Sequence, residues 1–265
     1  MPEPAGGGVH VKRRDGLPPE HFAVEAAGLR WLAAAADGVA VAEPVEVLPD
    51  GLVLPRVVQV APTPAAAEEF GRRLAATHAA GAPGFGSAPP GVAGDGWIAE
   101  LRLPLSERGS SAWGPFYAQQ RLLPFLRAAR DSGAVDAVGA AAVERVCALL
   151  VDSDPALTGP ERPPARLHGD LWSGNVLWSA EGAVLIDPAA HGGHPETDLA
   201  MLALFGLPHL DRALGACAEA AGLDRGWRGR VPLHQLHPLL VHAVLFGSGY
   251  GAQAVRAARA CLALG

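Results

Sequence analysis

Apolar and polar side chains alternate in short runs near the start of the chain. This alternation predicts a strand at Val9–Arg13. Two further strands are predicted at Val45–Leu48 and Leu52–Val58, because the turn sequence Pro49-Asp50-Gly51 joins them. Between the first strand and this pair, apolar residues recur at helical spacing across Pro19–Leu32, which predicts a helix.

Beyond residue 60 the spacing of apolar residues becomes helical. The predicted helices are Glu68–Ala80, Trp113–Ser132, Val135–Val151, Thr197–Phe205, Leu210–Ala221, Leu233–Phe246 and Gly249–Leu264. Gly- and Pro-rich loops are expected at Ala82–Gly96 and Pro155–Pro164, and a short strand at Ala183–Ile186. With strands expected mainly before residue 60 and helices after it, we predict an α+β fold in two lobes, a small β-rich lobe 1–60 and a larger helical lobe 61–265.

The bulk composition excludes several classes of protein. The chain of 265 residues is 49% hydrophobic and 18% charged, with a formal net charge of −6. A mildly acidic chain lacks the positive field of a nucleic-acid-binding protein. Its one basic cluster, Lys12-Arg13-Arg14, is short, and we interpret the two arginines as a solvated strand end. No apolar run approaches the length of a membrane span.

The three cysteines indicate a compartment. Cys147, Cys217 and Cys261 are widely spaced and match no metal-binding or redox pattern. A sparse, odd set of cysteines is typical of a reducing cytoplasm. The segment Met1–Gly8 has no apolar stretch like that of a signal peptide. We therefore expect a cytoplasmic protein with no nucleic acid and no membrane among its partners.

Two residue types are almost absent, so the positions where they occur are informative. The chain has one lysine, Lys12, among 21 basic residues, and one asparagine, Asn175. Lys12 lies on the first predicted strand. Asn175 lies in the polar, glycine-punctuated segment Arg166–Trp178.

The segment His168–Asn175, together with Asp187 after the next strand, has the parts that phosphoryl transfer requires. That reaction needs a carboxylate to orient the attacking hydroxyl and oxygen ligands to hold Mg²⁺ beside the phosphates. We expect Asp170 to accept or orient the hydroxyl proton, and Asn175 and Asp187 to hold the metal. The structural alternative is a capped turn followed by a hairpin, with incidental polar residues.

This layout resembles the kinase catalytic loop, with His168-Gly-Asp170 in place of His-Arg-Asp. His-Gly-Asp is the form seen in the aminoglycoside-phosphotransferase-like branch. The resemblance implies a two-lobed protein-kinase-like fold with ATP as phosphate donor. It also implies that Lys12 contacts the α- and β-phosphates and pairs with Glu25 on the following helix. Glu20, at the start of that helix, is the rival partner.

Further roles follow from the same resemblance. The residues at the expected adenine-contacting hinge are Leu54, Pro55, Arg56 and Val57. Because Pro55 has no N–H, a donor there would come from another position such as Val57. His168 is expected to pack within the loop. Asp198 is expected to brace the loop through its backbone N–H groups, with capping of the following helix by Thr197 or Asp198 as the other possibility.

The sequence His168-Gly-Asp-Leu-Trp-Ser-Gly-Asn175 is similar to the motif of the fructosamine kinase (ketosamine-3-kinase) family. Trp113–Pro124, Asp187–Met201 and Leu236–Tyr250 also resemble that family, and the similarity runs from about residue 9 to 255. The family's activity would transfer the ATP γ-phosphate to the sugar 3-hydroxyl of a fructosamine or ribulosamine. The product is unstable, so the reaction repairs glycation. Trp172 is expected to stack on the sugar, with core packing as the alternative.

The start of the chain departs from the kinase pattern. Only 11 residues precede Lys12, and Gly6-Gly7-Gly8 is too close to it for a glycine-rich loop on a hairpin. We expect a misassigned or shortened N-terminus that lacks the first strands and the phosphate lid. Weak ATP binding and slow turnover are the expected consequences.

Two other functions are compatible with these residues. A kinase for another small hydroxyl compound, such as an aminoglycoside or a choline-like amine, would use the same loop. A non-catalytic, pseudokinase-like binding protein would account for the missing lid, although Lys12, Asp170, Asn175 and Asp187 argue against it. The sequence leaves open which ketoamine is used, whether it is free or protein-bound, and the oligomeric state.

Overall fold

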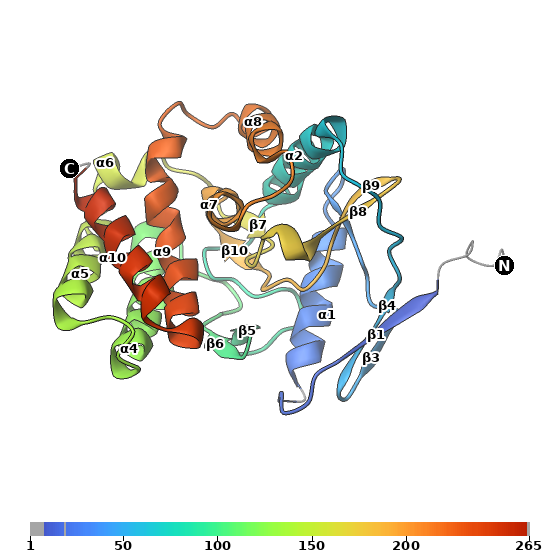
Figure 1. The fold of residues 1–265 in the computed structure, drawn as a ribbon, viewed down its shortest axis with the longest axis horizontal. Helices are drawn as coiled ribbons and strands as arrows, with labels where there is room; N and C mark the ends of the chain where they lie inside the picture. Colours follow the sequence, from blue (N-terminus) through green and yellow to red (C-terminus); the bar gives the residue numbers. More distant parts are fainter. Residues whose placement is uncertain (1–7, 19, 264–265) are drawn as a thin grey trace.

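The computed structural model describes residues 8–18 and 20–263. Of the glycine triplet near the start, Gly6 and Gly7 lie outside these residues. Figure 1 shows a small sheet with one helix at one end of the molecule and a larger group of helices at the other. Among the described residues, no helix is both long and apolar enough to cross a membrane.

The small sheet is antiparallel and three-stranded. Its strands lie in the order β1 (Val9–Arg13), β4 (Gly51–Pro55) and β3 (Glu46–Leu48). These strands and the turn between β3 and β4 confirm the sequence pattern. However, β4 ends at Pro55 rather than at Val58. Proline has no N–H with which to continue a ladder on that side.

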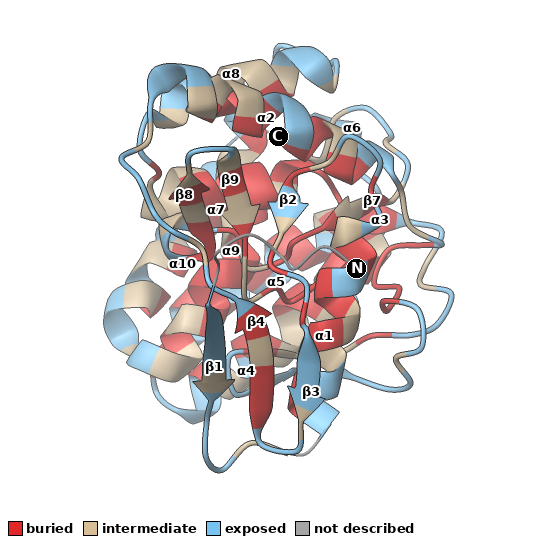
Figure 2. Ribbon diagram, turned by 90° about the vertical axis from the view of Figure 1, so that its right-hand side faces the viewer, coloured by how far each residue is buried: buried red, intermediate tan, exposed pale blue. Residues whose placement is uncertain are grey.

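Helix α1 (Glu20–Ala33) packs on this sheet. Phe22, Ala26 and Leu29 lie on one face of the helix and contact Leu52 and Leu54 of β4, all of them buried. As a result, β4 is largely buried, whereas the neighbouring β1 is mostly exposed (Figure 2). The alternation in β4 therefore selects which side chains form this small core.

A second sheet joins segments that are distant in the chain. β2 (Ala40–Val41) runs parallel to β9 (Gly182–Leu185), and β9 pairs in antiparallel register with β8 (Val176–Ser179). The N–H of Val60 also donates to the carbonyl of Trp178 at 2.8 Å. Two residues are too few to alternate visibly, so the sequence pattern does not predict β2. This pairing brings the end of β9 beside the N-terminal sheet.

Helices form most of the remaining chain. They are α2 (Pro64–Ala79), α3 (Trp113–Phe116), α4 (Leu123–Asp131), α5 (Ala137–Val151), α6 (Pro155–Thr158), α7 (Glu196–Phe205), α8 (Leu210–Ala220), α9 (Trp227–Phe246) and α10 (Ser248–Leu262). α2 packs on α8, and α9 packs on both α7 and α10. At the start of α2, the Thr63 hydroxyl accepts the N–H of Ala66 and caps the helix.

Two predicted helices differ in detail from the structure. The segment expected as one helix at Trp113–Ser132 contains a π-helical stretch, Tyr117–Leu122, between α3 and α4. Helix α9 begins at Trp227, before the predicted Leu233, and contains Pro232 and Pro238. A proline inside a helix removes one backbone hydrogen bond. Contacts with other elements must therefore compensate for the lost hydrogen bonds of α9, and a local sequence pattern does not reveal such contacts.

The expectation that strands lie mainly before residue 60 is wrong. β5 (Gly96–Ile98) and β6 (Leu101–Leu103) form a short hairpin just after the predicted Gly- and Pro-rich loop. β7 (Ala165–Leu167) pairs with β10 (His191–Gly193). All four have only three residues each, which is too short for an alternating pattern.

Candidate active site

The polar segment after β7 forms a tight loop that packs against the segment after β9. Gly169 has φ +81°, a conformation that L side chains rarely adopt, and a Cβ there would lie 2.2 Å from the carbonyl oxygen of Ala189. The ring of His168 contacts the carbonyl of Ile186 through Nε2 at 2.9 Å. Glycine at 169 therefore permits close contact between the two segments that carry Asp170 and Asp187.

Asp198, in the first turn of α7, is hydrogen-bonded to the backbone of this loop. Its carboxylate accepts the backbone N–H of His168 at 2.9 Å and that of Gly169 at 3.0 Å. Burial alone would raise the pKa of Asp198, but the hydrogen bond with His78 and the other donors outweigh it and lower the pKa. The ionised carboxylate thus holds two consecutive peptide groups of the loop.

His78 on α2 is a contributor that the sequence pattern did not single out. Its Nε2 lies 2.9 Å from Oδ2 of Asp198, and both side chains are buried. On the predicted helix Glu68–Ala80, helical spacing puts His78 on the same face as Phe70 and Leu74, which indicates burial and nothing more. Only the tertiary structure, in which α2 packs against β7, shows that Asp198 is the polar partner of His78.

The three predicted phosphotransfer residues lie together. Asn175 Nδ2 donates to the Asp170 carbonyl at 2.8 Å, to Asp170 Oδ2 at 3.1 Å, and to the carbonyl of Asp187 at 3.4 Å. Burial raises the pKa of Asp170 above its ordinary value, while His168 and Asn175 oppose that shift. The single asparagine of the chain therefore ties the two aspartate-bearing segments to each other.

Lys12 on β1 reaches the same place from the small sheet. Its ammonium lies 2.8 Å from both carboxylate oxygens of Glu25 and 3.0 Å from Oδ1 of Asp187. Burial raises the pKa of Glu25, and the charge of Lys12 opposes that shift. Glu20, one turn earlier on α1, is exposed. The structure thus brings Lys12, Glu25 and Asp187 together.

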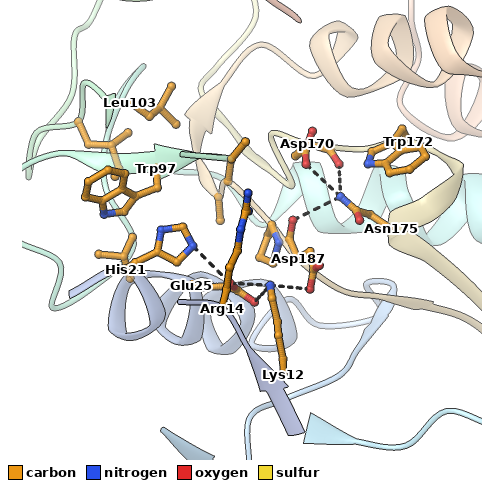
Figure 3. Close-up of a pocket in the computed structure, with 17 residues that line it drawn as sticks. Lys12, Arg14, His21, Glu25, Trp97, Leu103, Asp170, Trp172, Asn175 and Asp187 are labelled. Carbon is orange, nitrogen blue, oxygen red and sulfur yellow. Dashed lines mark hydrogen bonds and ion pairs between the residues drawn. The ribbon is translucent and has the colours of Figure 1, made fainter. Parts of the chain in front are cut away.

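A cavity of about 220 Å³ collects these groups (Figure 3). Its polar lining includes Lys12, Glu25, Asp170, Asn175 and Asp187. Trp172 lies at its edge with 41% of its surface exposed. Trp172 is therefore not part of a packed core, and its exposed surface is accessible to a ligand at the cavity edge.

The opposite wall of this cavity contains residues that the sequence pattern missed. They are His21 and Val24 of α1, Arg14 after β1, and Gly96, Trp97, Ala99, Leu103 and Leu105 of the β5–β6 hairpin and its surroundings. Trp97 lies in a hairpin whose strands are too short to be recognised from alternation. Arg14 was interpreted only as a solvated strand end.

A second cavity, of about 330 Å³, adjoins the first at Lys12 and Asp187. The four expected hinge residues, Leu54, Pro55, Arg56 and Val57, all line it. Leu177 and Ile186 contribute apolar surface from the other side. A mainly apolar slot beside backbone groups is suited to a flat heterocycle, and the shared lysine and aspartate lie between that slot and Asp170.

The donor set at the junction of the cavities fits a hard cation. Asp187 offers a carboxylate that is 38% exposed. Asn175 uses its side-chain nitrogen for the three hydrogen bonds above. Its side-chain oxygen, Oδ1, accepts no hydrogen bond from the described residues. Carboxylate and amide oxygens are the ligands that Mg²⁺ prefers. The chemistry of these two residues is therefore compatible with Mg²⁺.

This site combines a lysine paired with a helical glutamate, an aspartate beside an asparagine, and a second aspartate at the cavity junction. These are the parts from which protein-kinase-like phosphotransferases build their sites. The family model of fructosamine kinase matches residues 5–264. The chain belongs to the fructosamine kinase family, and it is an ATP-dependent kinase of that family.

Individual relatives agree with this assignment. A Thermus thermophilus protein described as a ketoamine kinase is 35% identical over 91% of this chain and 82% of its own length. The Arabidopsis thaliana chloroplastic protein-ribulosamine 3-kinase is 33% identical over 71% of this chain, which spans 54% of the Arabidopsis protein. A crystal structure from Thermobifida fusca, described as a fructosamine-3-kinase, has a TM-score of 0.86 at 48% identity, covering 97% of this chain and 86% of that one.

These likenesses confirm the predicted fold class, an α+β protein-kinase-like fold. Antibiotic phosphotransferases of known structure, at 19% and 17% identity, share the fold alone.

Proposed function

We propose that this chain transfers the γ-phosphate of ATP to the 3-hydroxyl of a ketoamine, a fructosamine or ribulosamine formed when a sugar glycates an amine. The names of the relatives support this acceptor, because they are ketoamine, ribulosamine and fructosamine kinases. The observation that carries the proposal is one cavity lined by Lys12, Asp170, Asn175 and Asp187, with an exposed tryptophan at its edge.

In the proposed reaction, Asp170 accepts the proton of the attacking hydroxyl. The sugar oxygen forms a bond to the γ-phosphorus, the bond from that phosphorus to the β,γ-bridging oxygen breaks, and ADP leaves. The raised pKa of Asp170 brings this carboxylate closer to the range of an effective general base. Trp172 would hold the sugar by stacking, and the product would fall apart to the free amine.

Lys12 would contact the α- and β-phosphates, with Glu25 holding its ammonium in place. Adenine would lie in the second cavity against Leu54, Pro55, Arg56 and Val57. Asn175 and Asp187 would hold Mg²⁺, which when bound neutralises charge on the phosphates. His168 and Asp198 would keep the loop in shape through the contacts described above.

Two further parts of the proposal concern the chain as a whole. We place the division between the ATP-binding lobe and the catalytic and substrate lobe at residue 60, in the extended segment between β4 and α2. We also propose a cytoplasmic location, since Cys147, Cys217 and Cys261 are buried free thiols.

The test is Asp170→Asn, assayed as ATP-dependent phosphorylation of a fructosamine. We expect kcat to fall by about 10²- to 10⁴-fold, the usual effect of removing a general base. The KM for ATP should change little, because Asp170 is not among the residues that line the second cavity. Asp131→Asn, an exposed aspartate on α4, is the matched control and should retain full activity.

Two results would overturn the proposal. Retained activity in Asp170→Asn would remove Asp170 from its catalytic role. A higher kcat/KM for an aminoglycoside or for choline than for the fructosamine would reassign the acceptor.

A further inference from the structure

Arg14 is a charged residue of the active-site cavity that the phosphotransfer reaction does not use. It follows β1 directly and lines the cavity that contains Asp170. Figure 3 shows its side chain standing between the wall formed by His21 and Trp97 and the group formed by Asp170 and Asp187.

Of the other basic side chains that line this cavity, one is already paired with carboxylates and the other is neutral. The ammonium of Lys12 is held by Glu25 and Asp187. Burial lowers the pKa of His21, and the charges of Lys12 and Arg14 lower it further, so the imidazole is neutral at pH 7. Arg14 is therefore the one cation among the lining residues that no buried carboxylate holds.

The partner of Arg14 is easily exchanged. Its Nη2 lies 2.7 Å from Oε2 of Glu100, at the turn between β5 and β6, and the two side chains are 50% and 55% exposed. Exposed pairs of this kind contribute about 0–1 kcal/mol. A carboxylate of a ligand inside the cavity could thus replace Glu100 at little cost.

Apart from the neutral His21, the wall beside Arg14 is mainly apolar. Gly96, Leu103 and Leu105 line it, and Trp97 is held in place by the guanidinium of Arg102, which lies 4.2 Å from its ring centroid. A short carbon chain that ends in an anion matches this combination of apolar wall and single cation. A long or cationic substituent does not.

We propose that Arg14 binds the carboxylate of the acceptor, and that the preferred acceptors are ketoamines formed from free α-amino acids. The inference rests on the proposed function. In such a compound the carboxylate is separated from the reacting 3-hydroxyl by C3, C2, C1, the amine nitrogen and the α-carbon alone, so both groups can occupy one small cavity. Arginine binds carboxylates through two parallel N–H donors. Glu100 holds the guanidinium when no acceptor is bound.

The experiment compares two acceptors of the same shape, fructosyl-glycine and fructosyl-glycinamide, at saturating ATP. Arg14→Gln should raise the KM for fructosyl-glycine by about tenfold, the low end of the range for a hydrogen bond to a charged group at a half-exposed site. The effect on the neutral glycinamide should be markedly smaller, so the ratio of the two KM values changes. Glu100→Gln should lower the KM for fructosyl-glycine, because Arg14 loses its competing partner.

Arg13→Gln is the matched control, since Arg13 pairs with exposed Asp50 and does not line the cavity. It should leave both KM values unchanged. An equal rise of both KM values in Arg14→Gln, or a raised KM for ATP, would assign Arg14 to the phosphates and overturn the inference. If the wild-type enzyme phosphorylates neither ketoamine, the proposed function itself fails, which is a distinct result.

Discussion

Lys12 holds two carboxylates that come from different parts of the fold. Glu25 is on the helix that packs under the small sheet, and Asp187 follows β9 in the second sheet. The Lys12–Glu25 pair is largely removed from water, with Glu25 only 7% exposed. A charge buried to this extent is costly without its partner. Glu25 should therefore govern where the ammonium of Lys12 points.

Glu25→Gln tests this role at the scale of one residue. The variant keeps the shape of the side chain but removes its charge, so Lys12 should move toward Asp187. We expect kcat/KM for ATP to fall by about tenfold to a hundredfold, as when a positioning contact is lost. Steady-state kinetics with varied ATP measure the effect.

Glu20→Gln serves as the comparison, because Glu20 is exposed at the start of the same helix. It should change kcat/KM by no more than about twofold. An equal loss of kcat/KM in the two variants would show that Glu25 matters only for the stability of α1 and does not position Lys12.

Helix α9 shows how one element depends on another. Pro238 has no N–H, so the carbonyl of His234, one turn earlier, has no helical donor. The hydroxyl of Tyr117 donates to this carbonyl at 3.0 Å and lies 3.1 Å from that of Leu233. The N–H of His237 in turn donates to the tyrosine oxygen at 3.3 Å. One buried hydroxyl thus repairs a break in a neighbouring helix.

Tyr117→Phe should destabilise the protein by about 1–3 kcal/mol, because it leaves buried backbone groups of α9 without partners. Urea unfolding gives the free energy of unfolding. Pro238→Ala returns an N–H to the helix. It should therefore be less destabilising in the Tyr117→Phe background than in the wild-type protein, and additivity of the two changes would contradict this account.

The whole molecule buries several histidines whose charged forms the fold disfavours. Burial lowers the pKa of His191 to about 3, and it also lowers the pKa values of His194 and His237 well below 6.5. Burial alone would raise the pKa of Glu196, but the nearby ring of His234, 3.5 Å away, and the hydrogen bonds from Arg230 outweigh it and lower the pKa to about 2. The Nε of Arg230 donates a hydrogen bond to Oε2 of Glu196 at 2.9 Å, which links α9 to α7.

The sign of the pH effect is the same for all these groups. As pH falls below 6.5, the unfolded chain takes up protons on histidines that stay neutral in the folded state, so the free energy of unfolding decreases. The stabilisation from Glu196 is fully present above pH 4.5 and is lost as pH falls toward about 2. From these groups we expect the free energy of unfolding to decrease as pH falls below about 6.5.

His237→Leu should reduce this dependence, since it removes one buried group that must stay neutral. Between about pH 6.5 and pH 5, the variant should lose less stability than the wild-type protein, by at most about 2 kcal/mol, the limit set by roughly 1.4 kcal/mol per proton and pH unit. Urea unfolding at both pH values measures the difference. His10→Gln, an exposed histidine on β1, should leave the dependence unchanged; parallel curves for His237→Leu and wild type would contradict the assignment.

The local pattern predicted much of this protein because it reports on burial along a single element. The first strand, the helix bearing Glu25, the hairpin before Pro55 and most later helices appear where the spacing indicated. It failed for β2, the β5–β6 hairpin and the β7–β10 pair. Strands of two or three residues owe their existence to partners elsewhere in the chain, so their own residues contain too little information.

By itself, the sequence determined which residues could perform phosphoryl transfer. Asp170, Asn175 and Asp187 were recognisable because their spacing along a loop and a strand is local, and Lys12 because it is the single lysine of the chain. Only the tertiary structure decided that Lys12 pairs with Glu25 rather than Glu20 and also meets Asp187, that His78 contacts Asp198, and that Arg14 lines the same cavity as Asp170. These are contacts between distant segments, and packing rather than spacing sets them.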